Sequence, residues 1–148
     1  MKCPFCRQAN TEVYNTRATK LGTQTWRRRR CLDCARVFTT YEAPDLSFLK
    51  VVGTAAGNSR RYSRAKLFSG LYAAFLDIPQ KDDTIDAVTD TIESKLLDLR
   101  KTPVSRHEIA DIVLSTLKHF NTAAFLRYLT THTDLASPAQ LKQALKKY

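Results

Sequence analysis

Four cysteines in two closely spaced pairs constrain this chain more than any other feature. Cys3 and Cys6 form one Cys-x2-Cys pair, Cys31 and Cys34 form the second, and 24 residues separate the pairs. Two thiolates with this spacing can face one ion from a tight turn, and two such turns complete a tetrahedral set of sulfur ligands, for which zinc is the usual metal. Because protein atoms fill all four positions, we expect one structural Zn²⁺ rather than a catalytic ion.

Two other interpretations of the cysteines remain open: four unrelated buried residues, or a duplicated redox pair. The chain runs into Cys3 without an apolar leader, so we expect a reducing cytoplasm, where metal binding is favoured over disulfides. No apolar stretch approaches the length of a membrane span. A first domain of residues 1–46 buries too little apolar surface to fold alone. Zinc should therefore supply its folding free energy, about 10–16 kcal/mol in comparable modules.

The residues between and after the cysteine pairs favour a small β-sheet. β-branched and aromatic residues predict short strands at residues 12–15, 23–26 and 37–41, with Gly22 in a turn. The second strand runs into four adjacent arginines. Because successive residues of a strand face opposite ways, Arg27 and Arg29 should share one face of the sheet, and Arg28 and Arg30 the other.

This row of arginines favours an anionic partner. The whole chain has 24 Lys and Arg against 14 Asp and Glu, a formal net charge of +10. A solvated charge run is the alternative, but adjacent like charges repel one another, which costs free energy. We therefore expect double-stranded DNA to bind at Arg17, Arg27, Arg28, Arg29 and Arg30. Five phosphate contacts should give a log–log salt slope of about −4 to −5.

The same segment resembles the N-terminal zinc ribbon of the NrdR family, the bacterial transcriptional repressors of ribonucleotide reductase genes. The resemblance covers the whole first domain and rests on residues 1–6, 26–31 and 37–42, together with Cys34. Where the family usually has Asp-Ser-Arg, this chain has Asn15-Thr16-Arg17, so only the arginine is retained. The resemblance implies a DNA-binding repressor whose second domain is an ATP-cone.

The second part of the chain, residues 47–148, has a helical pattern that begins after Pro44. Apolar residues at three- and four-residue steps predict helices at residues 64–76, from 83 or 84 to before 103, from 105, at 123–131 and from 137. Ser63 is a plausible N-cap, and Ser105 with Glu108 forms a capping box. Before these helices, residues 48–52 should form a strand, residues 53–58 a turn, and the residues near Arg61 a second strand.

This order of elements resembles the ATP-cone, which implies ATP or dATP as effector and a homo-oligomer whose size the nucleotide sets. The matching positions for nucleotide contacts are Lys50, Gly53, Tyr62, Arg64, Lys66 and Arg127. The chain departs from the family pattern at Val51, at Arg61 and at Phe125, where the family usually has an arginine, an acid and a tyrosine. Cations near a helix N-terminus suit a triphosphate, although ordinary surface cations are the alternative.

No pattern in the sequence indicates catalysis. His107, His119 and His132 have no ligand spacing with carboxylates or cysteines, and four glycines leave little material for a phosphate-binding loop. We therefore expect an α+β protein, a β zinc ribbon followed by a mostly helical ATP-cone-like domain with a short β-hairpin. It should be a cytoplasmic, nucleoid-associated repressor and not an enzyme. The alternative is a zinc-ribbon nucleic-acid-binding protein whose degenerate cone serves only for oligomerisation.

Overall fold

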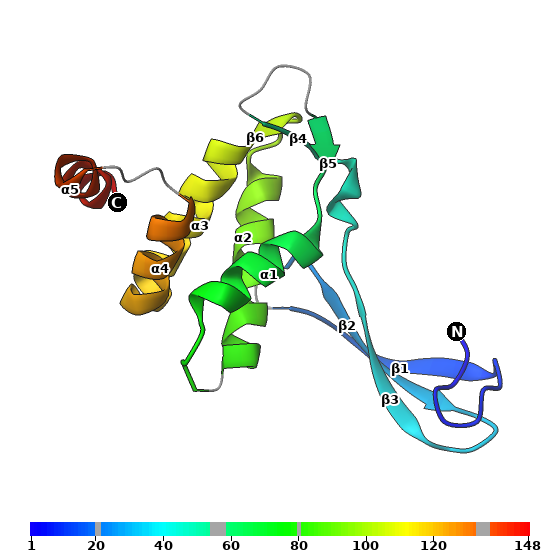
Figure 1. The fold of residues 1–148 in the computed structure, drawn as a ribbon. Helices are drawn as coiled ribbons and strands as arrows, with labels where there is room; N and C mark the ends of the chain where they lie inside the picture. Colours follow the sequence, from blue (N-terminus) through cyan, green and yellow to red (C-terminus); the bar gives the residue numbers. More distant parts are fainter. Residues whose placement is uncertain (20–21, 54–58, 80, 133–136) are drawn as a thin grey trace. The chain divides into compact units, whose positions relative to one another are not determined.

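The computed structural model describes residues 1–19, 22–53, 59–79, 81–132 and 137–148. The chain divides into two compact units, Met1–Asp45 and Leu46–Tyr148, which Figure 1 shows as a small β unit and a larger helical unit. This division lies one residue before the boundary that the sequence predicts. Among the described residues, no helix is both long enough and apolar enough to cross a membrane.

The first unit is built on one antiparallel sheet. Its strands are β1 (Thr11–Ala18), β2 (Thr25–Cys31) and β3 (Val37–Glu42), in the order β1-β2-β3, so that β2 is the central strand. The three predicted strands are confirmed, with different ends. β1 is longer at both ends because it pairs with β2 along its whole length, and β2 begins at Thr25, two residues later than predicted, and continues to Cys31. A bulge between Val13 and Asn15 interrupts the register at Tyr14.

The second unit contains a small sheet of three strands in the order β5-β4-β6. The predicted hairpin is β4 (Lys50–Val52) with β5 (Ser59–Arg61), and the residues before β4 form a 3-10 turn, η1 (Leu46–Phe48), instead of extending the strand. β6 (Val104–Ser105) pairs with β4 in parallel. Sequence patterns do not predict β6, because a strand of two residues has no periodicity.

All five predicted helices are confirmed: α1 (Arg64–Ala74), α2 (Lys81–Asp98), α3 (Arg106–Phe120), α4 (Thr122–His132) and α5 (Pro138–Lys147). The capping box at Ser105 and Glu108 is also confirmed, with both of its hydrogen bonds present. Ser63 is the residue before α1, as expected, but its side chain makes no capping hydrogen bond. The last turn of α2 stops at Asp98, earlier than Pro103 requires.

The core of the second unit lies among four helices. α1 packs against α2 and α4, and α3 packs against the same two helices (Figure 1). The largest fully buried side chains are Leu71, Phe75, Ile85, Val88, Thr89, Ile92, Leu96, Val104, Val113, Leu114, Leu117 and Leu129. By contrast, α5 has no buried residue and contacts the core only through partly buried side chains.

Candidate functional site

The four cysteine sulfurs lie together in the first unit. The Sγ atom of Cys3 is 3.7 Å from that of Cys34, and the Sγ atom of Cys6 is 3.5 Å from that of Cys31. All four sulfurs lie within 4.8 Å of one another. A tetrahedral zinc ion with Zn–S bonds of about 2.3 Å requires sulfurs about 3.8 Å apart, so the thiol set fits one zinc ion.

The two cysteine pairs are held by turns of the same design. The residue after each pair, Arg7 or Ala35, has a positive φ, 65° and 58° respectively. The backbone N–H of Cys3 donates to the carbonyl of Gln8 at 2.8 Å, and that of Cys31 donates to the carbonyl of Arg36 at 2.9 Å. Each turn therefore reverses the chain directly after its second thiol, which aims both thiols of the pair at one point.

Close packing of the thiols also affects their protonation. Burial alone would raise the pKa of Cys3, but hydrogen bonds from the backbone of Cys6 and Phe5 outweigh it and lower the pKa to about 7. At Cys6 the hydrogen bond with the backbone of Gln8 lowers the pKa, yet burial and the neighbouring thiols raise it to about 12. The pKa of one thiol is thus lowered and that of its neighbour raised, because the clustered thiols share hydrogen bonds with one another. Four thiolates this close would repel one another. A dication relieves that repulsion.

The four adjacent arginines lie on β2 in the middle of the sheet. Arg27 pairs across the strands with Thr16 and Thr40, whereas Arg28 pairs with Asn15 and Thr39. Residues directly opposite each other in an antiparallel pair point to the same face, so alternate arginines occupy opposite faces. The prediction that Arg27 and Arg29 share one face, and Arg28 and Arg30 the other, is confirmed.

Side-chain contacts distinguish these arginines. Arg27 forms an ion pair with Glu42 at 2.8 Å, and its Nε is buried without a hydrogen-bond partner. The Nε of Arg28 donates to the hydroxyl of Tyr14 at 3.3 Å. The Nε of Arg29 donates to the hydroxyl of Thr40 at 3.1 Å. Arg17, the fifth predicted DNA contact, lies over the ring of Trp26, 5.9 Å from its centroid.

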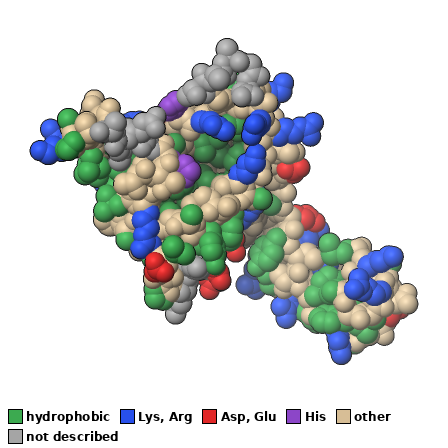
Figure 2. Space-filling model, in the orientation of Figure 1, with side chains coloured by type: hydrophobic (Ala, Val, Ile, Leu, Met, Phe, Trp, Pro, Cys, Tyr) green, Lys and Arg blue, Asp and Glu red, His purple; other side chains and the backbone are tan. Residues whose placement is uncertain are grey.

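The second unit contains a pocket of about 700 Å³ lined by cations. It is formed by the end of β4, by β5 and the residues that follow it, and by parts of α1, α3 and α4. Its lining residues are Val51, Gly53, Arg60, Arg61, Tyr62, Ser63, Lys66, Leu67, Arg106, His107, Ile109, Ala110, Tyr128 and His132. We call it the cationic pocket, and Figure 2 shows Lys and Arg side chains around a hollow on this unit.

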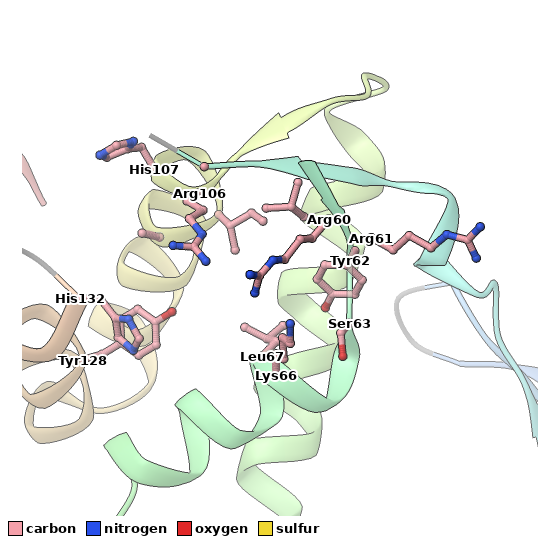
Figure 3. A pocket seen from close by; sticks show the side chains of 14 residues that line it. Arg60, Arg61, Tyr62, Ser63, Lys66, Leu67, Arg106, His107, Tyr128 and His132 are labelled. Carbon is pink, nitrogen blue, oxygen red and sulfur yellow. The ribbon is translucent and has the colours of Figure 1, made fainter. Parts of the chain in front are cut away.

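Three of the cations extend toward the same space from different elements. Arg60 comes from β5, Lys66 from α1 and Arg106 from the first turn of α3 (Figure 3). Arg61 and His107 extend away from the centre of the pocket. Three converging cations in a pocket that also has apolar and aromatic lining residues suit a ligand with a polyanionic group and a flat ring.

Aromatic residues form another wall of the cationic pocket. The rings of Tyr128 and His132 stack with their centroids 4.0 Å apart. Burial raises the pKa of Tyr128 to about 12, and partial burial lowers the pKa of His132. On the opposite side, the hydroxyl of Tyr62 donates to Glu93 at 3.0 Å. Burial and then the charge of Glu93 raise the pKa of Tyr62, so its phenol stays protonated.

The structure brings three of the six predicted nucleotide residues together and leaves three apart. Gly53, Tyr62 and Lys66 line the cationic pocket, whereas Lys50, Arg64 and Arg127 are absent from its lining. The guanidinium group of Arg64, in α1, donates hydrogen bonds to two carboxylates of α2, those of Glu93 and Asp90. The hydrogen bond to Asp90 is 2.8 Å long. Arg127 donates to the carbonyls of Ala74 and Leu76 behind the last turn of α1. The backbone N–H of Lys50 donates to Thr102.

The lining residues that sequence reasoning missed include Arg60, Arg106, His107, Tyr128 and His132. One signal was present for one of them. Arg106 directly follows the N-cap Ser105, and a cation is disfavoured in the first turn of a helix because the helix dipole is positive there. An anion bound at this position would offset that repulsion. The others have no such local signal.

Comparisons with known proteins agree with this arrangement. Residues 1–42 match the family described as "Transcriptional repressor NrdR-like, N-terminal domain", and residues 52–134 match the family described as "ATP cone domain". The three relatives that follow are each named "Transcriptional repressor NrdR". The protein of Laribacter hongkongensis is 32% identical over 147 residues, which is 99% of this chain and 96% of the relative.

Two further relatives are similar over the same span. The protein of Cupriavidus pinatubonensis is 34% identical over 145 residues, covering 98% of this chain and 94% of the relative. The protein of Albidiferax ferrireducens is 35% identical over 144 residues, covering 96% of this chain and 95% of the relative. The chain therefore belongs to the NrdR family, a family of nucleotide-responsive transcriptional repressors rather than enzymes, and it contains that family's zinc ribbon and ATP cone.

Proposed function

We propose that this chain represses transcription, with ribonucleotide reductase genes as its targets, by binding duplex DNA through its zinc ribbon and nucleotide through its cone. The observation that best supports the proposal is that this chain carries two cationic surfaces in separate units. The first unit has an arginine-bearing sheet next to a thiol tetrad that fits zinc, and the second unit has the cationic pocket. The first is suited to a DNA backbone and the second to a triphosphate. A repressor acts at the chromosome, so we place the protein in the cytoplasm at the nucleoid.

The DNA contacts are drawn from Arg17 and residues 27–30. Guanidinium groups bind phosphate oxygens through paired hydrogen bonds, and these contacts position a protein on DNA regardless of sequence. Cys3, Cys6, Cys31 and Cys34 hold the sheet in place through zinc, since the unit has few buried apolar side chains of its own. The zinc ion is structural here, because all of its positions are filled by sulfur.

ATP or dATP would occupy the cationic pocket. Lys66, Arg60 and Arg106 can hold the phosphates, and the N-terminus of α3 adds a favourable dipole. Tyr62 and Gly53 line the same pocket, and the stacked pair of Tyr128 and His132 offers a flat surface to a base. Roles for Lys50, Arg64 and Arg127 in nucleotide binding stay predictions from the family resemblance, and each of these would have to act from outside the pocket lining.

Nucleotide binding would control repression through assembly. One small ribbon makes few contacts with bases, so specific binding to DNA requires at least two copies of the chain, and the geometry between copies then sets the affinity. We propose a homo-oligomer whose size depends on whether ATP or dATP is bound. Each nucleotide must therefore bind one assembly more tightly than another. The factor by which a nucleotide shifts the assembly equilibrium equals the factor by which assembly changes the affinity for that nucleotide.

Equilibrium dialysis with labelled ATP and dATP tests the pocket, and sedimentation with and without each nucleotide tests the coupling. We expect the double variant Lys66→Ala with Arg106→Ala to lose binding at least tenfold, because two charge-assisted contacts are removed. Lys118→Ala is the matched control, since this exposed lysine of α3 does not line the pocket. Wild-type protein that binds no nucleotide would favour the alternative of a cone that serves only for oligomerisation. Identical assembly with both nucleotides would contradict the coupling.

A further inference from the structure

The two faces of the ribbon sheet carry different side chains. The cross-strand pairs place Arg17, Trp26 and Tyr41 side by side on one face, and two residues further along β2 they place Arg28 beside Thr39. We call this the tyrosine face. Its defining residues are Arg17, Trp26, Arg28, Arg30 and Tyr41, together with Tyr14 of the bulge, whose hydroxyl accepts from Arg28. The opposite face, which we call the glutamate face, carries Arg27, Arg29, Phe38, Thr40 and Glu42.

Charge compensation differs between the faces. On the glutamate face, Glu42 forms an ion pair with Arg27 at 2.8 Å, which leaves Arg29 as the one arginine without a carboxylate among the described residues of that face. On the tyrosine face, Arg17, Arg28 and Arg30 have no carboxylate in ion-pair contact among the residues that the structure describes, although Glu12 stands opposite Arg30 in the register. Three guanidinium groups on one small surface repel one another unless an anion lies over them. The tyrosine face therefore has the stronger attraction for phosphate.

One arginine of the tyrosine face is already held in position. The Nε of Arg28 donates to the hydroxyl of Tyr14, and its Nη1 donates to the hydroxyl of Thr39 at 3.2 Å. Neither partner carries charge, so the guanidinium group keeps its attraction for anions. Its remaining N–H groups are fixed before a ligand arrives, which lowers the entropy lost on binding.

Exposed aromatic rings border the same arginines. Tyr41 is 63% exposed and Tyr14 is 54% exposed, and both carry hydroxyl groups that can donate to phosphate oxygens. Trp26 stands between Arg17 and Tyr41 in the register and is partly buried, and the guanidinium group of Arg17 lies over its ring. Arginine, threonine and tyrosine side chains are the ones that commonly contact a DNA backbone.

We propose that the tyrosine face lies on duplex DNA, with Arg17, Arg28 and Arg30 on phosphates and with Tyr14 and Tyr41 as additional contacts. The inference rests on the proposed function of the ribbon as a DNA-binding domain. It divides the arginine row into two classes: Arg28 and Arg30 bind, whereas Arg27 and Arg29 stabilise the sheet. With three phosphate contacts in place of five, the log–log salt slope of one ribbon is about −3.

The test uses the full zinc-loaded protein, a mixed-sequence DNA duplex and fluorescence anisotropy over a range of salt concentrations. Arg28→Ala and Arg30→Ala are compared with Arg27→Ala and Arg29→Ala, which remove the same charge from the other face. We expect each tyrosine-face variant to lose roughly fivefold to tenfold in affinity at low salt and to lower the slope by about 1 per ribbon. The glutamate-face variants should leave the slope unchanged. Zinc content and the emission of Trp26 show which variants are folded.

Two conservative variants keep the test decisive if an alanine variant does not fold. Arg28→Lys keeps the positive charge but loses the planar guanidinium group that the neighbouring hydroxyls hold in place. The log–log salt slope should therefore be unchanged, whereas the affinity should fall several-fold. Tyr14→Phe removes the hydroxyl that holds Arg28 and should also weaken binding several-fold. Equal losses from both faces, or tighter binding to a single-stranded oligonucleotide than to the duplex, would overturn the inference. Failure of the wild-type protein to bind any duplex would overturn the proposed function itself.

Discussion

At the residue scale, the zinc site depends on two positions that carry no ligand. Arg7 and Ala35 each adopt a left-handed backbone directly after a cysteine pair, a conformation that costs a residue with a Cβ about 1–2 kcal/mol. Among the described residues of this small unit, only Cys3 and Cys31 are buried apolar side chains, which is too little to offset two such turns. We expect a bound metal to do so, because one ion satisfies four thiolates together.

Replacing one thiol should unfold the whole first unit. For Cys31→Ser we expect zinc content to fall from one ion per chain to nearly none, because a hydroxyl is a poor ligand for zinc beside three thiolates. Trp26 is the only tryptophan, so its emission should shift to that of a solvated indole. Far-UV circular dichroism should keep the helical signal of the second unit. An unchanged Trp26 emission in this variant would contradict a structural role for zinc.

His132 should report nucleotide binding through its protonation. Partial burial against Tyr128 lowers its pKa below the usual 6.5. With the base on the Tyr128–His132 pair, the phosphates still lie in the same pocket, and their negative charge favours the imidazolium, so we expect a higher pKa of His132 in the complex than in the free protein. Binding then takes up a proton, and ATP affinity should rise as the pH falls from about 7 to about 5.

Histidine resonances followed by NMR with and without ATP test this prediction. His119 is the matched control, since it lies exposed in the last turn of α3 and does not line the pocket. Its resonances should not shift when ATP is added. A His132 pKa that falls when ATP is added would contradict phosphate binding near this ring. His132→Gln should remove part of the pH dependence of affinity.

At the element scale, the N-terminal cap of α3 stabilises the first turn of the helix, and that same turn contributes a residue to the cationic pocket. The hydroxyl of Ser105 accepts from the backbone N–H of Glu108 at 3.2 Å, and the carboxylate of Glu108 accepts from the backbone N–H of Ser105 at 2.9 Å. The same carboxylate contacts Lys101. The contact with Lys101 and then the bonds with Ser105 lower the pKa of Glu108 to about 2. Its contribution to stability is therefore complete above about pH 4.5 and is lost as the pH falls toward 2.

Removing this cap should weaken both the fold and the nucleotide site. Ser105→Ala should lower the free energy of unfolding by about 1 kcal/mol, measured by urea titration of the helical signal. Nucleotide affinity should fall as well, because Arg106 lies in the turn that the cap holds. Ser137→Ala is the matched control, since Ser137 caps α5 in the same way and α5 does not line the pocket. Equal loss of nucleotide affinity in both variants would contradict a specific role for the cap of α3.

At the scale of the whole molecule, the two units draw their stability from different sources. The first unit depends on a metal, whereas the second has a continuous apolar core among α1 to α4. Each unit also has its own optical probe, because Trp26 lies in the first unit and the helices of the described residues lie in the second.

Unfolding should consequently show two transitions, each with its own ligand. A zinc chelator should abolish the Trp26 transition and leave the midpoint of the helical transition nearly unchanged. ATP at about 100 times its dissociation constant should stabilise the helical unit by about 2.7 kcal/mol and leave the Trp26 transition in place. Thermal scans that follow both signals provide the measurement. A single transition that moves equally with either ligand would contradict two separately stabilised units.

Most elements of the fold were predictable, because their signals are local. The cysteine spacing, the alternation on β2 and the caps at Ser105 and Ser137 each depend on residues within a few positions of one another, which is the range over which backbone hydrogen bonds act. β6 had no such signal, because it forms only by pairing with β4, some fifty positions away in the chain. The N-cap at Ser63 had the expected residue but not the hydrogen bond.

The pocket was only partly predictable for the same reason. Amino-acid order alone determined that this chain carries a thiol tetrad, a basic strand and a bundle of helices, since composition and short-range spacing are enough for each. Tertiary packing decided which cations meet: Arg60, Lys66 and Arg106 converge from three separate elements, while Arg64 turns to the carboxylates of α2. A charged side chain pairs with whichever partner the packing of distant helices brings close to it. Local sequence patterns carry no information about the distance between such partners.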